Sequence, residues 1–248
     1  MSQGKAYLER VGLWVGEDVL ARLGEVRVLL FGAGGVGSWC AEGLVRSGVK
    51  HLTLVDADVI SESNVGRQLM ATPRTVGQVK VEALRDRLLE VAPDAEITVY
   101  QKIFSAETAG EFAMEEYDYI LDAIDSLKDK GELILRATRT PAKFFCSMGA
   151  ACKVDPTQVK VGEFWNVRGC PLGAALRKKF KQNHTWPGRK FRCVYDEEVL
   201  PNRGGEGKAE TDLFNKAQIN GALVHITAMF GMTLSGLVIE DVYHQIVG

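Results

Sequence analysis

The sequence predicts an α/β protein with an open, mostly parallel sheet, helices on both faces and an antiparallel extension in the C-terminal half. Short apolar runs alternate with amphipathic segments through the first 147 residues, as in sheets whose parallel strands are joined by helices. A glycine-rich turn follows the first apolar run, and residues 158–164 alternate like an exposed or antiparallel strand. Together these observations indicate a Rossmann-like architecture.

The first strand–helix–strand unit supports this prediction. The run VRVLLF at residues 26–31 is β-branched and leucine-rich, which is typical of a parallel strand covered on both faces. Residues 38–47 are predicted to be helical, and HLTLVDAD, beginning at His51, is predicted to be a second strand that ends in acidic residues. The spacing is that of a βαβ unit.

The alternation continues to residue 147 and then changes. The predicted helices span residues 77–91, 106–114 and 126–138, and the predicted strands span residues 97–100, 117–123 and 143–147. Residues 168–192 form a polar, basic stretch, residues 201–207 are predicted to be a loop, and a helix closes the chain. No internal repeat or linker divides the sequence, so we expect one domain.

The bulk composition is that of a globular protein. Of 248 residues, 46% are hydrophobic and 25% are charged, which is enough apolar material for one core. The formal net charge of −2 gives no overall attraction to nucleic acid or anionic membranes, so any such binding needs a local patch. The N-terminus lacks the apolar core of a signal peptide, and we expect a cytoplasmic protein.

The cysteines form neither a disulfide framework nor a zinc motif. They are Cys40, Cys146, Cys152, Cys170 and Cys193. Their number is odd and no two are spaced as C-x-x-C, so reduced thiols are expected. Cys40 and Cys146 are interpreted as small buried residues, and no cysteine is assigned a catalytic role.

The segment at residues 217–239 contains no charged residue and has about the ~20 residues that cross a membrane. Polar side chains and three glycines are nevertheless scattered through it, including Gln218, Asn220, His225 and Thr227. This composition suits a helix buried against protein better than one facing lipid. We therefore predict a core or subunit-interface helix without membrane insertion.

GAGGVG at residues 32–37 fits the G-x-G-x-x-G pattern of turns that cradle phosphates. Gly32 allows the tight reversal, Gly34 lets a phosphate approach the backbone, and Gly37 allows close packing of helix on strand. The N-terminus of the following helix would offer free N–H groups to the anion. Gly35 is included among the expected nucleotide contacts.

Asp56 ends the second predicted strand, where an acid can hold ribose hydroxyls, and Asp58 is expected at the same site. This pattern alone does not separate NAD from ATP. A triphosphate attacked at its α-phosphorus needs several cations, whereas hydride transfer needs few. The residues that follow the strand supply polar and cationic groups, namely Asn64, Arg67, Gln68 and Lys80.

Two further acids, Asp122 and Asp125, lie at the end of a later predicted strand and would face the same crevice in a doubly wound sheet. Asp125 is placed to hold Mg²⁺, or alternatively to cap the helix that begins beside it. Because Arg67 and Lys80 are expected at the same site, we favour the metal-binding role of Asp125 over the capping role.

The set GAGGVGS, LVDAD, N-x-x-RQ, a lysine on the following helix and DAIDS resembles the ATP-binding core of the ThiF/MoeB/HesA superfamily, the prokaryotic relatives of ubiquitin-activating enzymes. The match covers roughly residues 10–150. It implies that Asp56 binds ribose and that Asp125 binds Mg²⁺. It also implies that Gln68 supports the loop that carries Asn64 and Arg67. Arg10 resembles an arginine that reaches into a partner subunit's site, which implies a homodimer. The phosphates would be contacted by Asn64, Arg67 and Lys80.

The second half of the chain resembles the tRNA threonylcarbamoyladenosine dehydratase branch of this superfamily. SMGAACKVDPT begins at Ser147 and CPLGAALRKKFK begins at Cys170, where the branch carries SMGA-x-x-x-x-DPT and a D-P-L-A-like helix start. CPLG is a mild departure, and residues 201–216 match less well. The two C-x-x-C pairs of members that charge ubiquitin-like proteins are absent.

The branch implies an ATP-dependent dehydratase that adenylates the carboxylate of threonylcarbamoyladenosine in tRNA, after which the carbamoyl nitrogen closes a ring with loss of AMP. A single adenylating domain would span residues 1–248, with ATP binding in residues 1–150 and substrate binding and dimerisation in residues 151–248. A sulfur-transfer protein as a partner and a monovalent cation beside the nucleotide are left open.

The basic stretch at residues 168–192 contains eight lysines or arginines and no acid. Such a stretch attracts backbone phosphates, and interleaved aromatic side chains can stack on unpaired bases. The alternative is a solvated helix face, and we favour contact with tRNA. The interleaved side chains are Phe180, His184, Trp186 and Phe191.

Two other functions share parts of the pattern. An adenylyltransferase acting on the C-terminus of a ubiquitin-like sulfur carrier would use every ATP-site residue, but the absent C-x-x-C pairs and the basic stretch favour tRNA. An NAD-dependent oxidoreductase or a non-catalytic nucleotide sensor would leave Arg67, Lys80 and Asp125 without a role.

Overall fold

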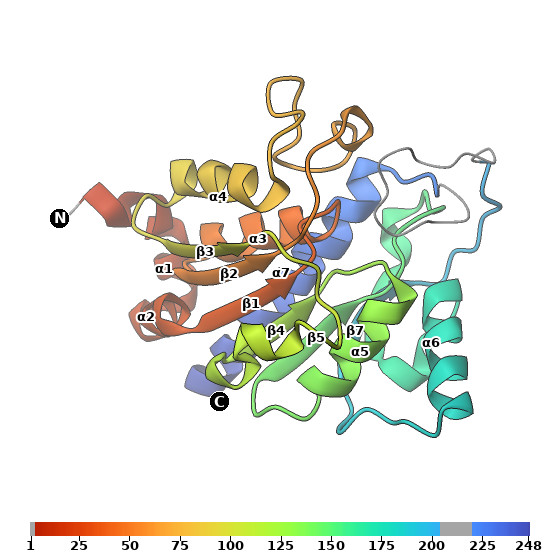
Figure 1. Cartoon of the computed structure of the whole chain (residues 1–248). Coiled ribbons are helices and arrows are strands. Elements are labelled where there is room, and N and C mark those ends of the chain that lie inside the picture. The colour runs from red at the N-terminus through yellow and green to blue at the C-terminus, as the bar shows by residue number, and fades with distance from the viewer. Residues whose placement is uncertain (1–2, 204–219) are drawn as a thin grey trace.

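Seven strands form one sheet in the order β3-β2-β1-β4-β5-β7-β6 in the computed structural model, which describes residues 3–203 and 220–248 (Figure 1). Neighbouring strands are parallel except β6 and β7, which are antiparallel. The predicted architecture is therefore confirmed. The strands are β1 Arg27–Phe31, β2 His51–Val55, β3 Glu96–Tyr100, β4 Tyr119–Asp122, β5 Lys143–Ser147, β6 Val159–Glu163 and β7 Arg192–Asp196.

Helices cover both faces of the sheet. Successive side chains of β1 therefore point into two different hydrophobic cores, one on each face. Val28 and Leu30 pack with residues of α2, α3, α4 and α7, whereas Leu29 and Phe31 pack with residues of α5 and α6. The α-helices are α1 Glu9–Val15, α2 Glu17–Glu25, α3 Gly37–Arg46, α4 Lys80–Val91, α5 Leu127–Ala137, α6 Pro171–Gln182 and α7 Val224–Val247. The 3-10 helices are η1 Gln3–Leu8, η2 Glu62–Asn64, η3 Ala109–Phe112, η4 Met114–Glu116, η5 Pro156–Gln158 and η6 Phe164–Asn166.

The strand register brings the ends of the three central strands together. Phe31, the last residue of β1, is aligned with Val55 of β2 and with Asp122 of β4. The loops that follow these strands therefore leave the sheet at one edge. Open parallel sheets bind ligands at this edge, where the strand order reverses.

Helix α7 packs closely along α3. A Cβ on Gly43 would lie 2.3 Å from Ser235 Oγ, and a Cβ on Gly231 would lie 2.4 Å from the carbonyl oxygen of Val36, so both glycines permit the approach. By length and hydropathy α7 could cross a membrane, but half of its apolar window is buried inside the protein. It thus packs as the core helix that the sequence predicts.

Some predicted elements differ from the structure. Residues 106–114 do not form an α-helix: a turn at residues 106–108 leads into η3, and Ala113, with a left-handed backbone at φ 42°, separates η3 from η4. The helix predicted from residue 77 begins at Lys80, since Gly77 also has a positive φ, 89°.

The sequence pattern also missed elements in the second half and at the start. Strand β7 and the helices before β1 are not among the predicted elements. The closing helix begins at Val224 and not near residue 217. Residues 204–207 of the predicted loop and residues 217–219 lie outside the described part of the chain.

Candidate functional site

The glycine-rich turn between β1 and α3 has no room for side chains on its inner side. Gly32 has φ 92°, and a Cβ there would lie 2.7 Å from the carbonyl oxygen of Ala123, just beyond β4. A Cβ on Gly37 would lie 1.7 Å from the carbonyl oxygen of Gly32. A Cβ on Gly34, by contrast, would come no closer than 3.9 Å to another residue. The outer side of the turn is therefore where a phosphate can approach the backbone.

Asp56 faces this turn from the end of β2. Its Oδ2 accepts the backbone N–H of Ala33 at 2.7 Å, and its Oδ1 accepts the backbone N–H of Asp58 at 2.9 Å. Burial raises the pKa of Asp56, while the nearby Lys80 ammonium and the two N–H donors act in the opposite direction. The carboxylate is thus fixed beside the turn, and each oxygen keeps a lone pair for a further donor.

Lys80, the first residue of α4, is buried beside Asp58. Its exposed fraction is 6%, and its Nζ lies 2.7 Å from Asp58 Oδ2. The backbone N–H of Lys80 also donates to the Asp58 carbonyl at 3.0 Å. These contacts close the loop between β2 and α4 and hold the ammonium near the carboxyl end of β2.

The loop between β2 and α4 is fastened to α3 and lies beside the glycine turn. The Trp39 indole N–H donates to the Arg67 carbonyl at 3.2 Å. Gln68 lies beside Gly34, and within the described residues its Oε1 is buried without a hydrogen-bond partner. A buried amide oxygen without a donor is costly, so a donor from a ligand or water is expected there.

Asn64 and Arg67 differ in how many of their hydrogen-bonding groups are used within the loop. Asn64 is 7% exposed, and its Oδ1 accepts the backbone N–H of Ser61 at 3.1 Å in a capping box. Arg67 is partly exposed, and its Nη1 donates to the Ser63 carbonyl at 2.8 Å. The Asn64 oxygen is used by the loop itself, whereas the Arg67 guanidinium carries further donors suited to an anion.

Asp125 is exposed in the loop that follows β4. The N-cap of α5 is Ser126, whose Oγ accepts the Asp129 N–H at 3.4 Å. The alternative role of Asp125 as the cap is therefore wrong. The same loop passes against the glycine turn, because the Ala123 carbonyl abuts Gly32. A carboxylate in this loop is the type of oxygen ligand that Mg²⁺ prefers.

Asp122 does not face the crevice as predicted. It is fully buried, its Oδ1 lies 2.8 Å from Lys130 Nζ of α5, and its Oδ2 accepts the Cys146 thiol at 3.3 Å. Burial raises the pKa of Asp122, with Lys130 opposing it. Burial alone would lower the pKa of Lys130, but the Asp122 carboxylate prevails and raises it. The pair ties α5 to β4 below the site.

Arg10 lies away from the glycine-rich turn of its own chain. It is exposed on α1, which packs on α2. In turn α2 packs on the residues before β2, since a Cβ on Gly48 would lie 2.9 Å from Leu20. These elements stand at the edge where the strands begin, opposite the turn (Figure 1).

The basic stretch forms α6 and the loop that leads to β7. Phe180 and Phe191, which we expected to face RNA, are buried and pack around Phe164, because they complete the core under α6. Trp186 is 48% exposed and packs on Trp165 with 5.5 Å between ring centroids. Of the interleaved side chains, His184 and Trp186 are the ones that face solvent.

The cations of this stretch also divide into two groups. The Arg189 guanidinium donates to the carbonyls of Thr140 and Ala142, and Arg192 pairs with Glu240 at 2.8 Å. These two arginines are used within the fold. Three exposed lysines form no ion pair within the described residues, namely Lys178, Lys181 and Lys190.

Most of the five cysteines are buried. All five are free thiols, and four are buried, including Cys193 on β7 and Cys170 at the start of α6. Burial raises the pKa of the Cys40 thiol, which opposes thiolate formation.

The ThiF family model matches residues 7–244 of this chain. The tRNA threonylcarbamoyladenosine dehydratase of Haemophilus influenzae is 34% identical over 230 residues, covering 90% of this chain and 88% of that protein. The molybdopterin-synthase adenylyltransferase of Escherichia coli is 35% identical over 162 residues, covering 65% of this chain and 62% of that protein. The structure of E. coli tRNA N6-threonylcarbamoyladenosine dehydratase, TcdA, in complex with ATP is similar with a TM-score of 0.86 and 27% identity, covering 98% of this chain and 96% of that one.

Proposed function

The chain belongs to the ThiF family, and on this premise we propose that it is an ATP-dependent tRNA threonylcarbamoyladenosine dehydratase. The observation that carries the proposal is how much of the chain each relative covers. Similarity to the dehydratases extends through both halves, including the ATP-bound structure that covers 98% of the chain. Similarity to the adenylyltransferase stops at 65% of the chain.

The proposed reaction removes one water from the nucleoside at the expense of ATP. The threonyl carboxylate attacks the α-phosphorus of ATP, and pyrophosphate leaves. The carbamoyl nitrogen then attacks the resulting acyl adenylate, loses its proton as the C–N bond forms, and displaces AMP. Activation is needed because a carboxylate oxygen is a poor leaving group, whereas AMP is a good one.

The residues around the turn fit ATP. Asp56 would accept ribose hydroxyls, because its carboxylate is fixed beside the turn with lone pairs to spare. The backbone at Gly34 and the N-terminus of α3 would face the phosphates. The donors of Arg67 and the Lys80 ammonium, held by Asp58, would neutralise the charge that develops on the leaving pyrophosphate.

Asp125 is the residue proposed to hold Mg²⁺. It fits this role because it is an exposed carboxylate in the loop that abuts the glycine turn. When bound, Mg²⁺ would supply Lewis-acid stabilisation of the phosphate oxygens.

We propose that Arg10 acts in a homodimer, since it lies at the opposite edge from the turn of its own chain. Its helix α1 also exposes Leu13 and Trp14, with exposed fractions of 80% and 86%. Large exposed apolar side chains beside a proposed intersubunit arginine support a protein contact on this helix. A sulfur-transfer partner, a monovalent cation and a cytoplasmic location stay predictions.

The proposed tRNA surface follows α6. This helix begins beside the segment after β5, where Cys170 Sγ accepts the Gly149 N–H at 3.4 Å. Twelve helical residues extend about 18 Å from there, which places Trp186 beyond the far end of the helix. We therefore assign Lys178 and Lys181 to the phosphate backbone and not Trp186 to bases beside the reacting adenosine.

The test uses tRNA carrying threonylcarbamoyladenosine, Mg-ATP and the purified protein. We expect digested tRNA to contain a nucleoside lighter by one water, with AMP released in equal amount. No such species by mass spectrometry, together with ATP–pyrophosphate exchange that depends on a ubiquitin-like sulfur carrier, would favour the adenylyltransferase instead.

A further inference from the structure

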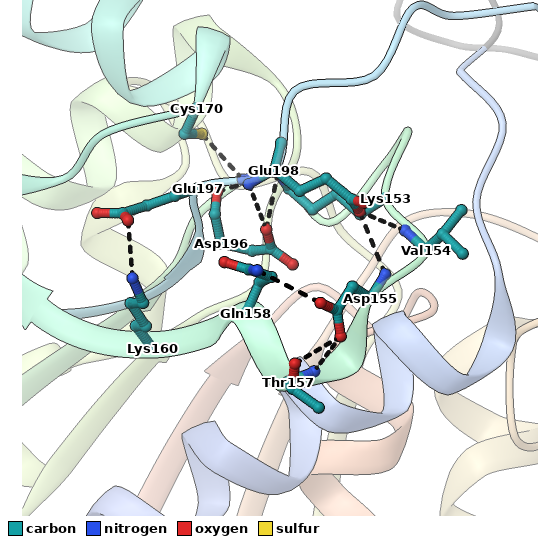
Figure 2. A network of polar contacts seen from close by, with 11 residues as sticks. Lys153, Val154, Asp155, Thr157, Gln158, Lys160, Cys170, Asp196, Glu197 and Glu198 are labelled. Atoms are coloured by element: carbon teal, nitrogen blue, oxygen red, sulfur yellow. Dashed lines mark hydrogen bonds and ion pairs between the residues drawn. The ribbon is translucent and has the colours of Figure 1, made fainter.

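The Lys153 ammonium is buried in a cage of oxygen atoms at the carboxyl ends of β5 and β7 (Figure 2). Lys153 is 4% exposed, and its Nζ donates to the Asp196 carbonyl at 3.0 Å and to the Glu198 carbonyl. It also lies 3.5 Å from Asp196 Oδ1. A buried ammonium is tolerated only with such partners. The side chain therefore joins the segment after β5 to the end of β7.

A second set of contacts runs in the opposite direction between the same two segments (Figure 2). Glu198 Oε2 accepts the backbone N–H groups of Val154 and Asp155, the latter at 3.2 Å. Within the segment at the end of β7, the Glu198 N–H donates to Asp196 Oδ1 at 2.7 Å, which holds the Glu198 backbone in place. Each segment thus satisfies polar groups of the other, so displacing one would leave the other with unsatisfied groups.

Residues 149–155 also contact the starts of α6 and α7. The Gly149 N–H donates to Cys170 at the start of α6. The ring Nε2–H of His225, near the start of α7, donates to the Val154 carbonyl at 2.9 Å. The same end of α7 supports the nucleotide turn. The contact there is between Gly35 and Thr227, since a Cβ on Gly35 would lie 3.2 Å from Thr227 Cβ.

The backbone of this segment is strained beside Lys153. Cys152 has φ 57°, in the left-handed region that side chains other than glycine rarely adopt. Its N–H donates to the Gly221 carbonyl at 2.9 Å, ahead of α7. Strained backbone persists where its surroundings hold it, and it gathers at functional sites.

We propose that Lys153 is a positioning residue, which holds residues 149–155 as a wall between the nucleotide turn and the tRNA surface on α6. The inference rests on the proposed function and deepens it. Lys153 is enclosed by protein oxygens and acts through the backbone that it fastens. Its loss leaves ATP binding in place and impairs the use of tRNA.

The decisive variant is K153M/D196N. K153M alone leaves the Asp196 carboxylate buried without a cation and lowers the melting temperature, so a loss of activity would have two causes. The double variant carries neither charge, and we expect it to fold with a higher melting temperature than K153M and to keep unchanged ATP affinity by calorimetry. We expect kcat/KM for tRNA to fall at least tenfold, mainly through KM, because the two carbonyls have lost their donor.

The matched control is K160M. Lys160 also joins β6 to the residues after β7, through Glu197 at 2.7 Å, but its side chain is 45% exposed. We expect wild-type kinetics for this variant, since exposed ion pairs contribute little. Hydrogen exchange gives a readout independent of RNA: the amides of Cys152, Val154 and Asp155 should exchange faster in K153M/D196N than in wild type.

Three outcomes separate the hypotheses. Impaired kcat/KM and faster exchange in the folded double variant support the positioning role. Wild-type kcat/KM in that variant overturns it. If wild-type protein dehydrates no tRNA, the proposed function fails, and unchanged amide exchange in the double variant then overturns the positioning of the wall as well.

Discussion

The nucleotide turn and the wall at residues 149–155 stand at the same edge of the sheet but are specified in different ways. The turn is six consecutive residues, and two of its glycines, Gly32 and Gly37, are required by backbone atoms that would lie 2.7 Å and 1.7 Å from an added Cβ. The wall depends on Lys153 and Glu198, whose contacts join residues more than 40 positions apart. A site built from contiguous backbone can be recognised in a sequence, whereas a cage of distant polar groups cannot.

The largest effect on stability is expected where a buried pair is broken. Lys130→Met leaves the fully buried Asp122 carboxylate without its cation, which should lower the free energy of unfolding by about 3–5 kcal/mol. Urea unfolding of wild type and variant measures this difference in the free energy of unfolding. Lys128→Met, on the exposed side of the same helix, should change stability by less than about 0.5 kcal/mol. Equal stability of both variants would contradict the importance of the pair.

The same pair predicts a pH dependence at the alkaline end. Asp122 raises the pKa of Lys130 in the folded state, so the pair's contribution is fully present below the ordinary lysine value of about 10.5. It is lost as pH rises through the raised folded value. The stability difference between wild type and Lys130→Met should therefore narrow above that pH. If the stability difference between the two proteins grows above that pH, the pKa of Lys130 is not raised in the folded state.

The turn itself should respond sharply to one added methyl group. Gly37→Ala places a Cβ against the backbone of Gly32, where no flexible side chain can yield, and should cost about 3 kcal/mol. ATP binding, measured by calorimetry, should be lost. Gly34→Ala meets no other residue within 3.4 Å and should keep the fold while weakening ATP affinity. Similar folding defects in both variants would refute the steric argument.

Replacing Asp125 tests the proposed metal-assisted reaction without disturbing the fold. Asp125→Ala should reduce tRNA dehydration about 100-fold or more, because it removes the carboxylate that we propose to hold Mg²⁺, and metal stabilisation of the transition state contributes several kcal/mol. Its melting temperature should match wild type, since the residue is exposed. Glu115→Ala, an exposed acid near the amino end of β4, serves as the control. Full turnover by Asp125→Ala would exclude Asp125 from the mechanism.

The smallest effects are expected on α6. Lys178→Ala and Lys181→Ala should each weaken tRNA binding a few-fold and reduce the slope of log affinity against log salt by about 0.7–0.9. Filter binding at several salt concentrations measures both. Lys50→Ala, which removes an ion pair with Asp94 before β2, should leave the slope unchanged. An unchanged slope in both α6 variants would show that these lysines do not contact the tRNA backbone.

Much of the first half could be predicted because its signals are local. The strands β1 to β5 and the helices α3, α4 and α5 lie within a few residues of the predicted ranges, since periodicity and turn residues are properties of short windows. The second half was less predictable. Strand β7 is only five residues long and begins with a charged residue, and it becomes a strand through pairing with both β5 and β6.

Individual side chains show the same limit. Asp122 and Asp125 are three residues apart at one strand end, yet one is fully buried and the other is exposed. Phe180 and Trp186 both lie in the basic stretch, but the first fills the core beneath α6. Burial depends on which element covers a residue, and that element can lie anywhere in the chain.

The sequence by itself determined the nucleotide turn, the acid after β2 and the order of strands and helices that brings them to one edge. These features follow from sterics and alternation within a few residues. Only the tertiary structure decided which charges are buried and with whom they pair, as with Asp122 and Lys130 or Asp196 and Lys153. The reason is physical: the free energy of a charge depends on its solvent and its partners, and both are set by packing between distant segments.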